Sequence, residues 1–140
     1  MSLLLDTCVI SEAVKQMPNA RVSQWLAAQD DDALHLSVIT LGELEKGISR
    51  LPESRRRSQL ETWLAHDIRA RFEGRMLPIS LDVALHWGRL QAECASQGRP
   101  LPVIDSLLAS TALVHNLTLV TRNVEGFAVT GLDVFNPWQE

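Results

Sequence analysis

The sequence predicts an α/β fold in which a mostly parallel sheet is covered by helices on both faces. Short apolar runs of strand length alternate with helical segments along all 140 residues, a pattern typical of βαβ units. No repeat, linker or low-complexity region interrupts the alternation. Because a chain of this length buries roughly 68 to 70% of its unfolded surface, we predict a single domain over residues 1–140.

The first half of the chain contains two predicted strands and three predicted helices. Three leucines form a short buried run before Asp6, and the helical spacing that follows ends at Pro18. Three consecutive aspartates form the turn before the second apolar run. The expected elements are a strand over 3–5, a helix over 9–14, a helix over 20–29, a strand over 34–38 and a helix over 41–50.

The second half continues the alternation after Pro52. One segment places large apolar residues on one face and arginines opposite, which predicts an amphipathic helix. Ser80 suits the cap of the next helix, Gly98 and Pro100 end it, and Pro102 opens the last one. The expected elements are a helix over 54–72, a strand over 76–79, a helix over 82–96, a helix over 102–116 and a strand over 117–121.

Composition indicates a cytoplasmic protein with reduced thiols. Cys8 and Cys94 form no C-x-x-C pair, and the first residues lack the features of a secretion signal. The longest mostly apolar stretch, 101–114, is interrupted by Asp105 and is shorter than the ~20 residues of a membrane span. We therefore expect no membrane segment.

The net charge of −4 argues against non-specific coating of nucleic acid, because that affinity comes from cations that neutralise phosphates. The basic residues are nevertheless uneven: 11 are Arg and 2 are Lys, and seven arginines lie between Arg50 and Arg75. Such a run is either an exposed helical face or a stripe that contacts phosphate. Any nucleic-acid role must be local or assisted by a metal.

Four separated motifs supply the candidate chemistry. Asp6 follows the first apolar run, Glu43 lies in a Leu-Gly-Glu-Leu segment and Asp105 lies near the start of a helix. Thr121-Arg122-Asn123 follows the last predicted strand. Carboxylates that share one site repel one another unless a cation balances them, and the hard oxygen ligands suit Mg²⁺ or Mn²⁺.

Each acid also has an ordinary structural explanation, because each is predicted near a helix start, where a carboxylate accepts free backbone N–H groups. Asp6 suits an N-cap, Thr40 and Glu43 have the spacing of a capping box, and Asp105 suits a first turn. In an open parallel sheet, ligands bind beyond the carboxyl ends of strands. That rule places Asp6, Glu43 and Asn123 together but does not place Asp105.

The motifs together resemble the PIN-domain family and, more closely, VapC-type toxins of bacterial toxin-antitoxin pairs. The resemblance covers nearly the whole chain, with the motifs in the expected order. It is carried by Leu5-Asp6-Thr7-Cys8-Val9-Ile10-Ser11-Glu12, Thr40-Leu41-Gly42-Glu43-Leu44-Glu45-Lys46-Gly47-Ile48, Pro100-Leu101-Pro102-Val103-Ile104-Asp105-Ser106-Leu107-Leu108-Ala109, Leu119-Val120-Thr121-Arg122-Asn123, Trp87-Gly88-Arg89-Leu90 and Asn136-Pro137-Trp138.

The resemblance implies a three-layer α/β/α sandwich and metal-dependent cleavage of RNA, with 5′-phosphate and 3′-hydroxyl products. It also implies a homodimer, an antitoxin that covers the site and a larger toxin-antitoxin assembly. The metal ligands would be Asp6, Glu43 and Asp105. Thr7 and Thr121 would supply hydroxyls that orient a carboxylate or a metal-bound water, and the catalytic set would be Asp6, Glu43, Asp105, Thr121 and Asn123.

The fourth motif departs from the commonest family pattern, because Asn123 stands where an acid is usual. An amide can ligate through its carbonyl but adds no charge. Glu125 is either a substitute acid or an exposed loop residue, and Arg122 is either a phosphate contact or the ion-pair partner of an acid. A binding module with a decayed site is the alternative function.

Other readings of the motifs fail on spacing. A haloacid-dehalogenase-like phosphatase needs a second Asp where Cys8 stands. The histidines and cysteines lack the paired spacing of a zinc site. The apolar stripe formed by Leu60, Trp63 and Leu64 is expected either to pack in the core or to receive an amphipathic antitoxin segment.

Overall fold

The computed structural model describes residues 2–139 and places five strands in one sheet. The order across the sheet is β3-β2-β1-β4-β5, and all four pairings are parallel. The fold class predicted from sequence is therefore confirmed. The strands are β1 (Leu3–Leu5), β2 (Leu34–Ser37), β3 (Met76–Leu77), β4 (Thr118–Val120) and β5 (Val134–Phe135).

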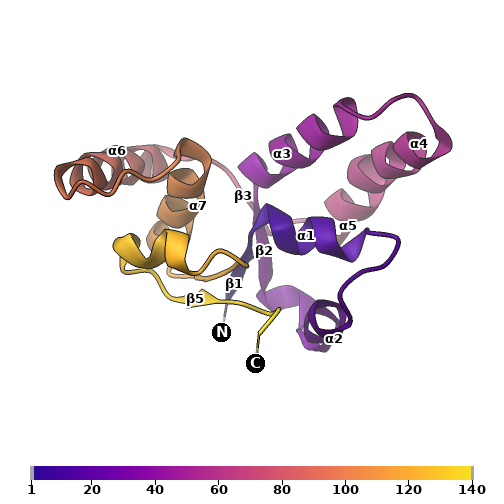
Figure 1. The fold of residues 1–140 in the computed structure, drawn as a ribbon, viewed down its shortest axis with the longest axis horizontal. Coiled ribbons are helices and arrows are strands. Elements are labelled where there is room, and N and C mark those ends of the chain that lie inside the picture. The colour runs from indigo at the N-terminus through magenta and orange to yellow at the C-terminus, as the bar shows by residue number, and fades with distance from the viewer. Residues whose placement is uncertain (1, 140) are drawn as a thin grey trace.

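Helices cover the sheet in two separate layers (Figure 1). One layer is formed by α1 (Thr7–Ala13), α2 (Ala20–Ala28), α3 (Val38–Ser49), α4 (Arg55–Thr62), the π-helix η2 (Trp63–Ile68) and α5 (Arg69–Arg71). The other is formed by α6 (Leu81–Ser96), α7 (Val103–Val114) and the 3₁₀-helix η3 (Glu125–Thr130). A second 3₁₀-helix, η1 (Asp31–Ala33), leads into β2. The sandwich of three layers follows from this arrangement.

The central strand β1 connects the two cores because its side chains alternate between faces. Leu3 and Leu5 pack with the helices of the first layer, including Val9 of α1. Leu4 packs on the opposite face with residues of α6, α7 and η3, among them Phe127. The side chains of Leu4 and Leu5 are completely buried, so three residues anchor the strand from which Asp6 emerges.

The first turn of α3 differs from the prediction. The helix begins at Val38, directly after β2, because the Ser37 side chain caps it by accepting the Ile39 N–H at 3.1 Å. Thr40 therefore lies inside the helix, and the predicted capping box with Glu43 does not form. Shifting the helix start in this way leaves the Glu43 carboxylate free for a different contact.

The other differences concern element bounds. The amphipathic helix predicted over 54–72 is continuous, but its middle is the π-helix η2. The short edge strand β5 was missed because two residues show no alternation pattern. Between residues 2 and 139, no helix has both the length and the apolar character needed to cross a bilayer.

Truncation of Leu4 tests the role of β1 as the shared anchor of both cores. Leu4→Ala should lower the free energy of unfolding by about 2–5 kcal/mol, because it leaves a cavity in a fully buried site. Urea denaturation would measure the change. Met17→Ala, at a position that is 89% exposed, is the control and should change stability by less than about 0.5 kcal/mol; equal losses in both variants would contradict this assignment.

Candidate active site

Three neighbouring strands deliver the candidate residues to one edge of the sheet. Asp6 follows β1, α3 with Glu43 follows β2, and Thr121 follows β4. The backbone N–H of Asp6 donates to the carbonyl of Val120 at 2.9 Å, so the ends of β1 and β4 are tied together. The sheet order β2-β1-β4 therefore puts the residues at the carboxyl edge predicted from sequence.

Both oxygens of the Asp6 carboxylate are oriented by hydrogen bonds. Oδ1 accepts the backbone N–H of Thr7 at 2.7 Å, which is the predicted N-cap contact of α1. Oδ2 accepts the hydroxyl of Thr121 at 2.7 Å. Thr121 is fully buried, and its Oγ1 in turn accepts the backbone N–H of Asn123 at 3.1 Å. The predicted role of Thr121 in orienting a carboxylate matches this geometry.

Glu43 is held by a second threonine. The hydroxyl of Thr7 donates to Oε1 of Glu43 at 2.6 Å, across 36 positions of sequence. Oγ1 of Thr7 also lies 3.3 Å from Oγ1 of the buried Thr40. Because Thr7 starts α1 and Glu43 lies on α3, this hydroxyl couples the two helices at the point where the acids meet.

Asp105 reaches the site from the other helical layer. It lies in the first turn of α7, which contacts α3. The same turn is anchored through the buried Ser106, whose Oγ accepts the side-chain N–H groups of Trp87 at 2.9 Å and Gln91 at 2.5 Å. Ser106 Oγ also donates to the carbonyl of Val103 at 2.7 Å. These contacts with α6 fix the turn that carries Asp105.

The charges of the three acids interact. The pKa of the Asp105 carboxyl is raised, first by partial burial and then by the negative charges of Asp6 and Glu43. No hydrogen bond from residues 2–139 offsets the charge on Asp105. Repulsion of this kind shows that the three carboxylates lie close enough to share an electrostatic environment.

The donor set fits a hard divalent cation. It consists of carboxylate oxygens, and Asp105 retains both of its oxygens for a ligand. The described residues contain no group of three or more His, Cys, Asp or Glu placed so that together they could hold a metal ion. A closed protein cage is unnecessary for Mg²⁺, however, because this ion keeps several waters and is usually held by one or two carboxylates.

Cys8 lies beside the same site without offering a thiolate. Its sulfur is 3.8 Å from Oγ1 of Thr121. The pKa of the Cys8 thiol is raised, mainly by burial and also by the charge of Asp6. The sulfur is therefore protonated near neutral pH and leaves the acidic site an all-oxygen one.

Asn123 and Glu125 occupy the loop after β4. The Asn123 side chain is exposed, and its Oδ1 accepts the N–H of Gly126 at 3.2 Å. A Cβ on Gly126 would lie 2.2 Å from Nδ2 of Asn123, so any larger residue there would have to displace the Asn123 side chain. Glu125 is exposed at the start of η3. Asn123 is thus linked to Asp6 only through its backbone and Thr121.

The sequence interpretation did not identify Glu12 as an important residue. Glu12 is 4% exposed and accepts Lys15 Nζ at 2.9 Å and the backbone N–H of Asn19 at 2.9 Å. The pKa of its carboxyl is lowered, first by Lys15 and then by that backbone N–H. Arg122 lies 3.8 Å from the same carboxylate, so its ion-pair partner is Glu12 and not one of the three acids of the site. The signal available in the sequence was the position of Glu12, an acid on the face of α1 that points into the protein.

The arginine run over 50–75 is largely engaged with the protein itself. Arg56 donates to the carbonyl of Val14, and Arg57 donates to that of Leu51 at 2.9 Å. Arg71 pairs with Asp31 at 3.2 Å, and Arg75 donates to the carbonyl of Leu34 at 2.6 Å. At these four positions the guanidinium groups bond within the protein, an outcome that differs from both the exposed helical face and the phosphate stripe that the sequence suggested.

Two hollows lie along α3, and one of them reaches Glu43. One, of about 290 Å³, is lined by Glu43 together with Leu60 and Trp63. The other, of about 690 Å³, is lined by residues that include Leu41 and Leu64. The predicted apolar stripe of η2 and the end of α4 is therefore divided between two hollows rather than facing one groove.

Known proteins share this fold and this sequence pattern. Residues 3–131 match the PIN domain family. The chain is 35% identical to the VapC ribonuclease Y4jK of Sinorhizobium fredii over 137 residues, 98% of each chain. It is also 35% identical to the toxin FitB of Neisseria gonorrhoeae over 138 residues, 99% of each chain. The crystal structure of FitAcB from that organism superposes with a TM-score of 0.94 over 99% of each chain, at 35% identity.

Replacement of Asp105 by Asn tests the electrostatic cost of the acidic cluster. Because the folded-state pKa is raised, the folded protein binds this proton more tightly than the unfolded chain, and ionisation above that pKa destabilises the fold. In EDTA at pH 7, Asp105→Asn should therefore unfold at higher urea concentration than the unmodified chain.

The gain should disappear as the pH falls below about 3.9, where the unfolded carboxyl is also protonated. Urea midpoints over a pH series would provide the measurement. A variant less stable than the parent at pH 7 would mean that the Asp105 charge is compensated in the fold.

Proposed function

Because this chain belongs to the PIN-domain family, we propose that it is the ribonuclease toxin of a bacterial toxin-antitoxin pair. The observation that carries the proposal is the acidic site itself. Asp6, Glu43 and Asp105 come from three separate segments, and two of them are oriented by buried or half-buried threonine hydroxyls. A site with this composition suits metal-assisted hydrolysis of an RNA phosphodiester.

We propose Mg²⁺ as the cofactor, with Mn²⁺ as a substitute, held by Asp6, Asp105 and Glu43. When bound there, the ion lowers the pKa of a coordinated water and neutralises negative charge on the reacting phosphate. Glu43 has two candidate roles, as a ligand or as the group that orients the attacking water. Its Oε2 atom serves either role, because Thr7 engages only Oε1.

The threonines keep the carboxylates in position. Thr121 aligns Oδ2 of Asp6, and Thr7 aligns Oε1 of Glu43, so each acid presents a defined set of free lone pairs. Water attacks in line with the leaving 3′ oxygen, which takes up a proton as the bond breaks. The products of this reaction are 5′-phosphate and 3′-hydroxyl ends.

We assign Asn123 a catalytic role at the fourth position, as a neutral amide at the rim of the site. Its backbone N–H is bonded to Thr121, and its Oδ1 is engaged by Gly126. The side-chain NH₂ group is therefore the part of Asn123 that can donate to substrate. The exposed Glu125 is assigned no role.

A cognate antitoxin is the proposed protein partner, in keeping with the toxin-antitoxin complexes among the structural relatives. We also propose a homodimer that joins a larger toxin-antitoxin assembly. Large exposed apolar side chains, including Leu81, Leu85 and Val103, are available for such contacts. We also propose that the protein acts in the cytoplasm, where it would meet its RNA substrate and its antitoxin.

A binding module with a decayed site is the second candidate function, and Asn123 is the residue that favours it. The oriented carboxylates argue against decay. A site that no longer binds metal has no need to keep three repelling acids, because the repulsion destabilises the fold.

Cleavage of total cellular RNA by the purified chain tests the function. Mg²⁺ or Mn²⁺ should support discrete cuts with 5′-phosphate and 3′-hydroxyl ends, and EDTA should abolish them. Asp6→Asn and Asp105→Asn should each lower kcat/KM by at least about 100-fold, because each removes a charged ligand worth several kcal/mol.

Asp133→Asn is the matched control, because it removes the same charge from an exposed acid and should leave the rate within about twofold. Ends with 2′,3′-cyclic phosphate would rule out the metal-water mechanism. Absence of cuts by folded, partner-free protein would favour the binding module.

Thr121 provides a test of ligand orientation. Thr121→Val removes the hydroxyl bonded to Asp6 with little change in volume, and should weaken Mg²⁺ or Mn²⁺ binding by about 10–100-fold. Thr121→Ser keeps the hydroxyl and should stay within a few-fold of the parent. Calorimetric titration with each metal would measure both variants, and equal affinities of the Val variant and the parent would refute the orienting role.

A further inference from the structure

A buried carboxylate near the acidic site pairs with two cations whose side chains are more than half exposed. Glu12 has a side chain that is 5% exposed, whereas the side chains of Lys15 and Arg122 are 56% and 57% exposed. Nζ of Lys15 lies 2.9 Å and a guanidinium nitrogen of Arg122 lies 3.8 Å from Oε1 of Glu12. One negative charge and two positive charges leave a local excess of one positive charge.

The guanidinium of Arg122 is also held by the end of the chain. Its central carbon lies 4.3 Å from the centre of the Trp138 ring, within the range of a cation–π interaction. The side-chain amide of Asn136 donates to the carbonyl of Arg122 at 3.4 Å, and Asn136 Oδ1 accepts the backbone N–H of Trp138 at 2.9 Å. Arg122 is therefore fixed at both its backbone and its head group.

Trp138 contacts the guanidinium of Arg122 through the face of its ring. Its buried Nε1–H has no acceptor within residues 2–139. A buried donor without a hydrogen-bond partner lowers stability, so the indole N–H does not account for the position of Trp138 against Arg122. The ring packs against the first-layer core on one side and carries the guanidinium at its face.

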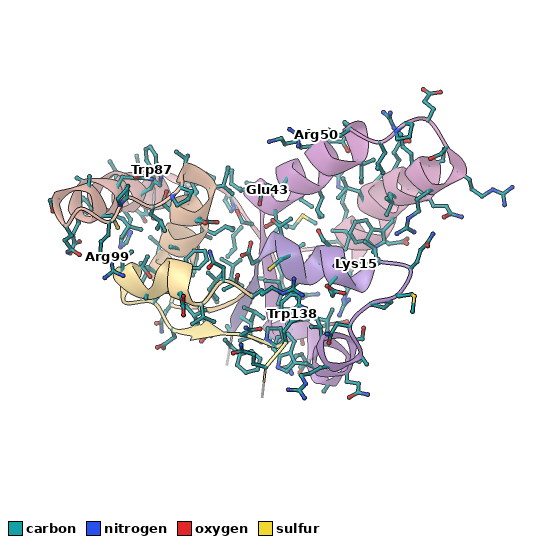
Figure 2. The ribbon with its side chains drawn as sticks, in the orientation of Figure 1. Lys15, Glu43, Arg50, Trp87, Arg99 and Trp138 are labelled. Carbon is teal, nitrogen blue, oxygen red and sulfur yellow. The ribbon has the colours of Figure 1, made fainter. Side chains whose placement is uncertain are left out.

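This cationic pair lies beside the acidic site but not within it. Arg122 directly follows Thr121, which binds Asp6. Glu12 lies six residues after Asp6 along α1, which is about 9 Å at 1.5 Å per residue. In Figure 2, Lys15 lies on α1 and Trp138 lies below it toward the C-terminal end, whereas Arg99 lies in the second helical layer at the opposite side of the view.

We propose that Arg122 and Lys15 form a binding site for an RNA phosphate next to the scissile one, with Glu12 and Trp138 as positioning residues. The proposal rests on the proposed function in that RNA is the substrate. A guanidinium fork and an ammonium group are the side chains that bind phosphate oxygens best. A pair of fixed cations beside three carboxylates draws the backbone of a polyanion past the acids in one register.

Substitution of Arg122 tests the phosphate contact. Arg122→Ala should raise KM for a single-stranded RNA substrate by about tenfold, the effect of losing one charge-assisted hydrogen bond, and should change kcat by less than about threefold. Arg122→Lys should recover part of the loss. Binding of a fluorescein-labelled RNA 12-mer in the Asp105→Asn background should show a salt slope shallower by about 0.7, one phosphate contact fewer.

Arg99→Ala is the matched control, because it removes the same charge from an exposed position far from the pair. It should leave KM and the salt slope unchanged. Normal KM and salt slope for Arg122→Ala, or equal changes for Arg99→Ala, would overturn the proposal while the ribonuclease function stands. If the parent cleaves no RNA, the proposed function fails, and the salt slope alone decides whether Arg122 contacts phosphate.

Trp138 variants test positioning separately. Trp138→Phe keeps an aromatic face and should hold KM within about twofold of the parent, whereas Trp138→Leu should raise it by about two- to fivefold. Thermal melting of both variants accompanies the kinetics. Equal KM values for the two variants, with both folded, would show that the ring does not position Arg122.

Discussion

Two threonine hydroxyls maintain the geometry of the acidic site. Thr121 donates to Asp6 and Thr7 donates to Glu43, each at less than 2.8 Å. The N-cap contact with the Thr7 N–H holds only one oxygen of Asp6, so without the hydroxyls the repelling carboxylates would be freer to turn toward solvent. Thr121 follows β4 and bonds Asp6 at the end of β1, and Thr7 starts α1 and bonds Glu43 on α3. The site therefore exists only when β1, β4 and α3 are assembled. Folding and site formation are therefore one event.

Charge repulsion remains even in the assembled site. It contributes to the raised pKa of the Asp105 carboxyl, which is partly buried, lacks a hydrogen-bond donor from the described residues and faces the charges of Asp6 and Glu43. The fold tolerates this destabilisation because α7 is anchored elsewhere, through Ser106, Trp87 and Gln91. A cation that neutralises the three acids would convert the repulsion into binding energy. The same repulsion that lowers the stability of the metal-free protein would thus favour the binding of a metal ion.

The sequence predicted the parts of the site that depend on strand ends. The rule that parallel strands end at one edge led us to expect Asp6, Glu43 and Asn123 together, and in the structure each of them follows a strand that ends at that edge. The capping box at Glu43 was wrong, since Ser37 caps α3 three residues earlier. Strand-end rules gave no position for Asp105, which enters from α7 across the sheet. The Glu12–Arg122 contact joins positions 110 apart, and local spacing carries no information on such a pair.

The net charge of the whole chain is a poor guide to the local charge beside the acidic site. The total of −4 argues against broad affinity for RNA. Around Glu12 the balance is reversed, because one buried carboxylate faces two exposed cations. A polyanion approaching this edge meets a local positive charge within about a Debye length of the acids. The position that an RNA backbone takes relative to the three acids then depends on the distance between the acidic site and the cationic pair around Glu12. That distance is set by α1, which is a rigid helix.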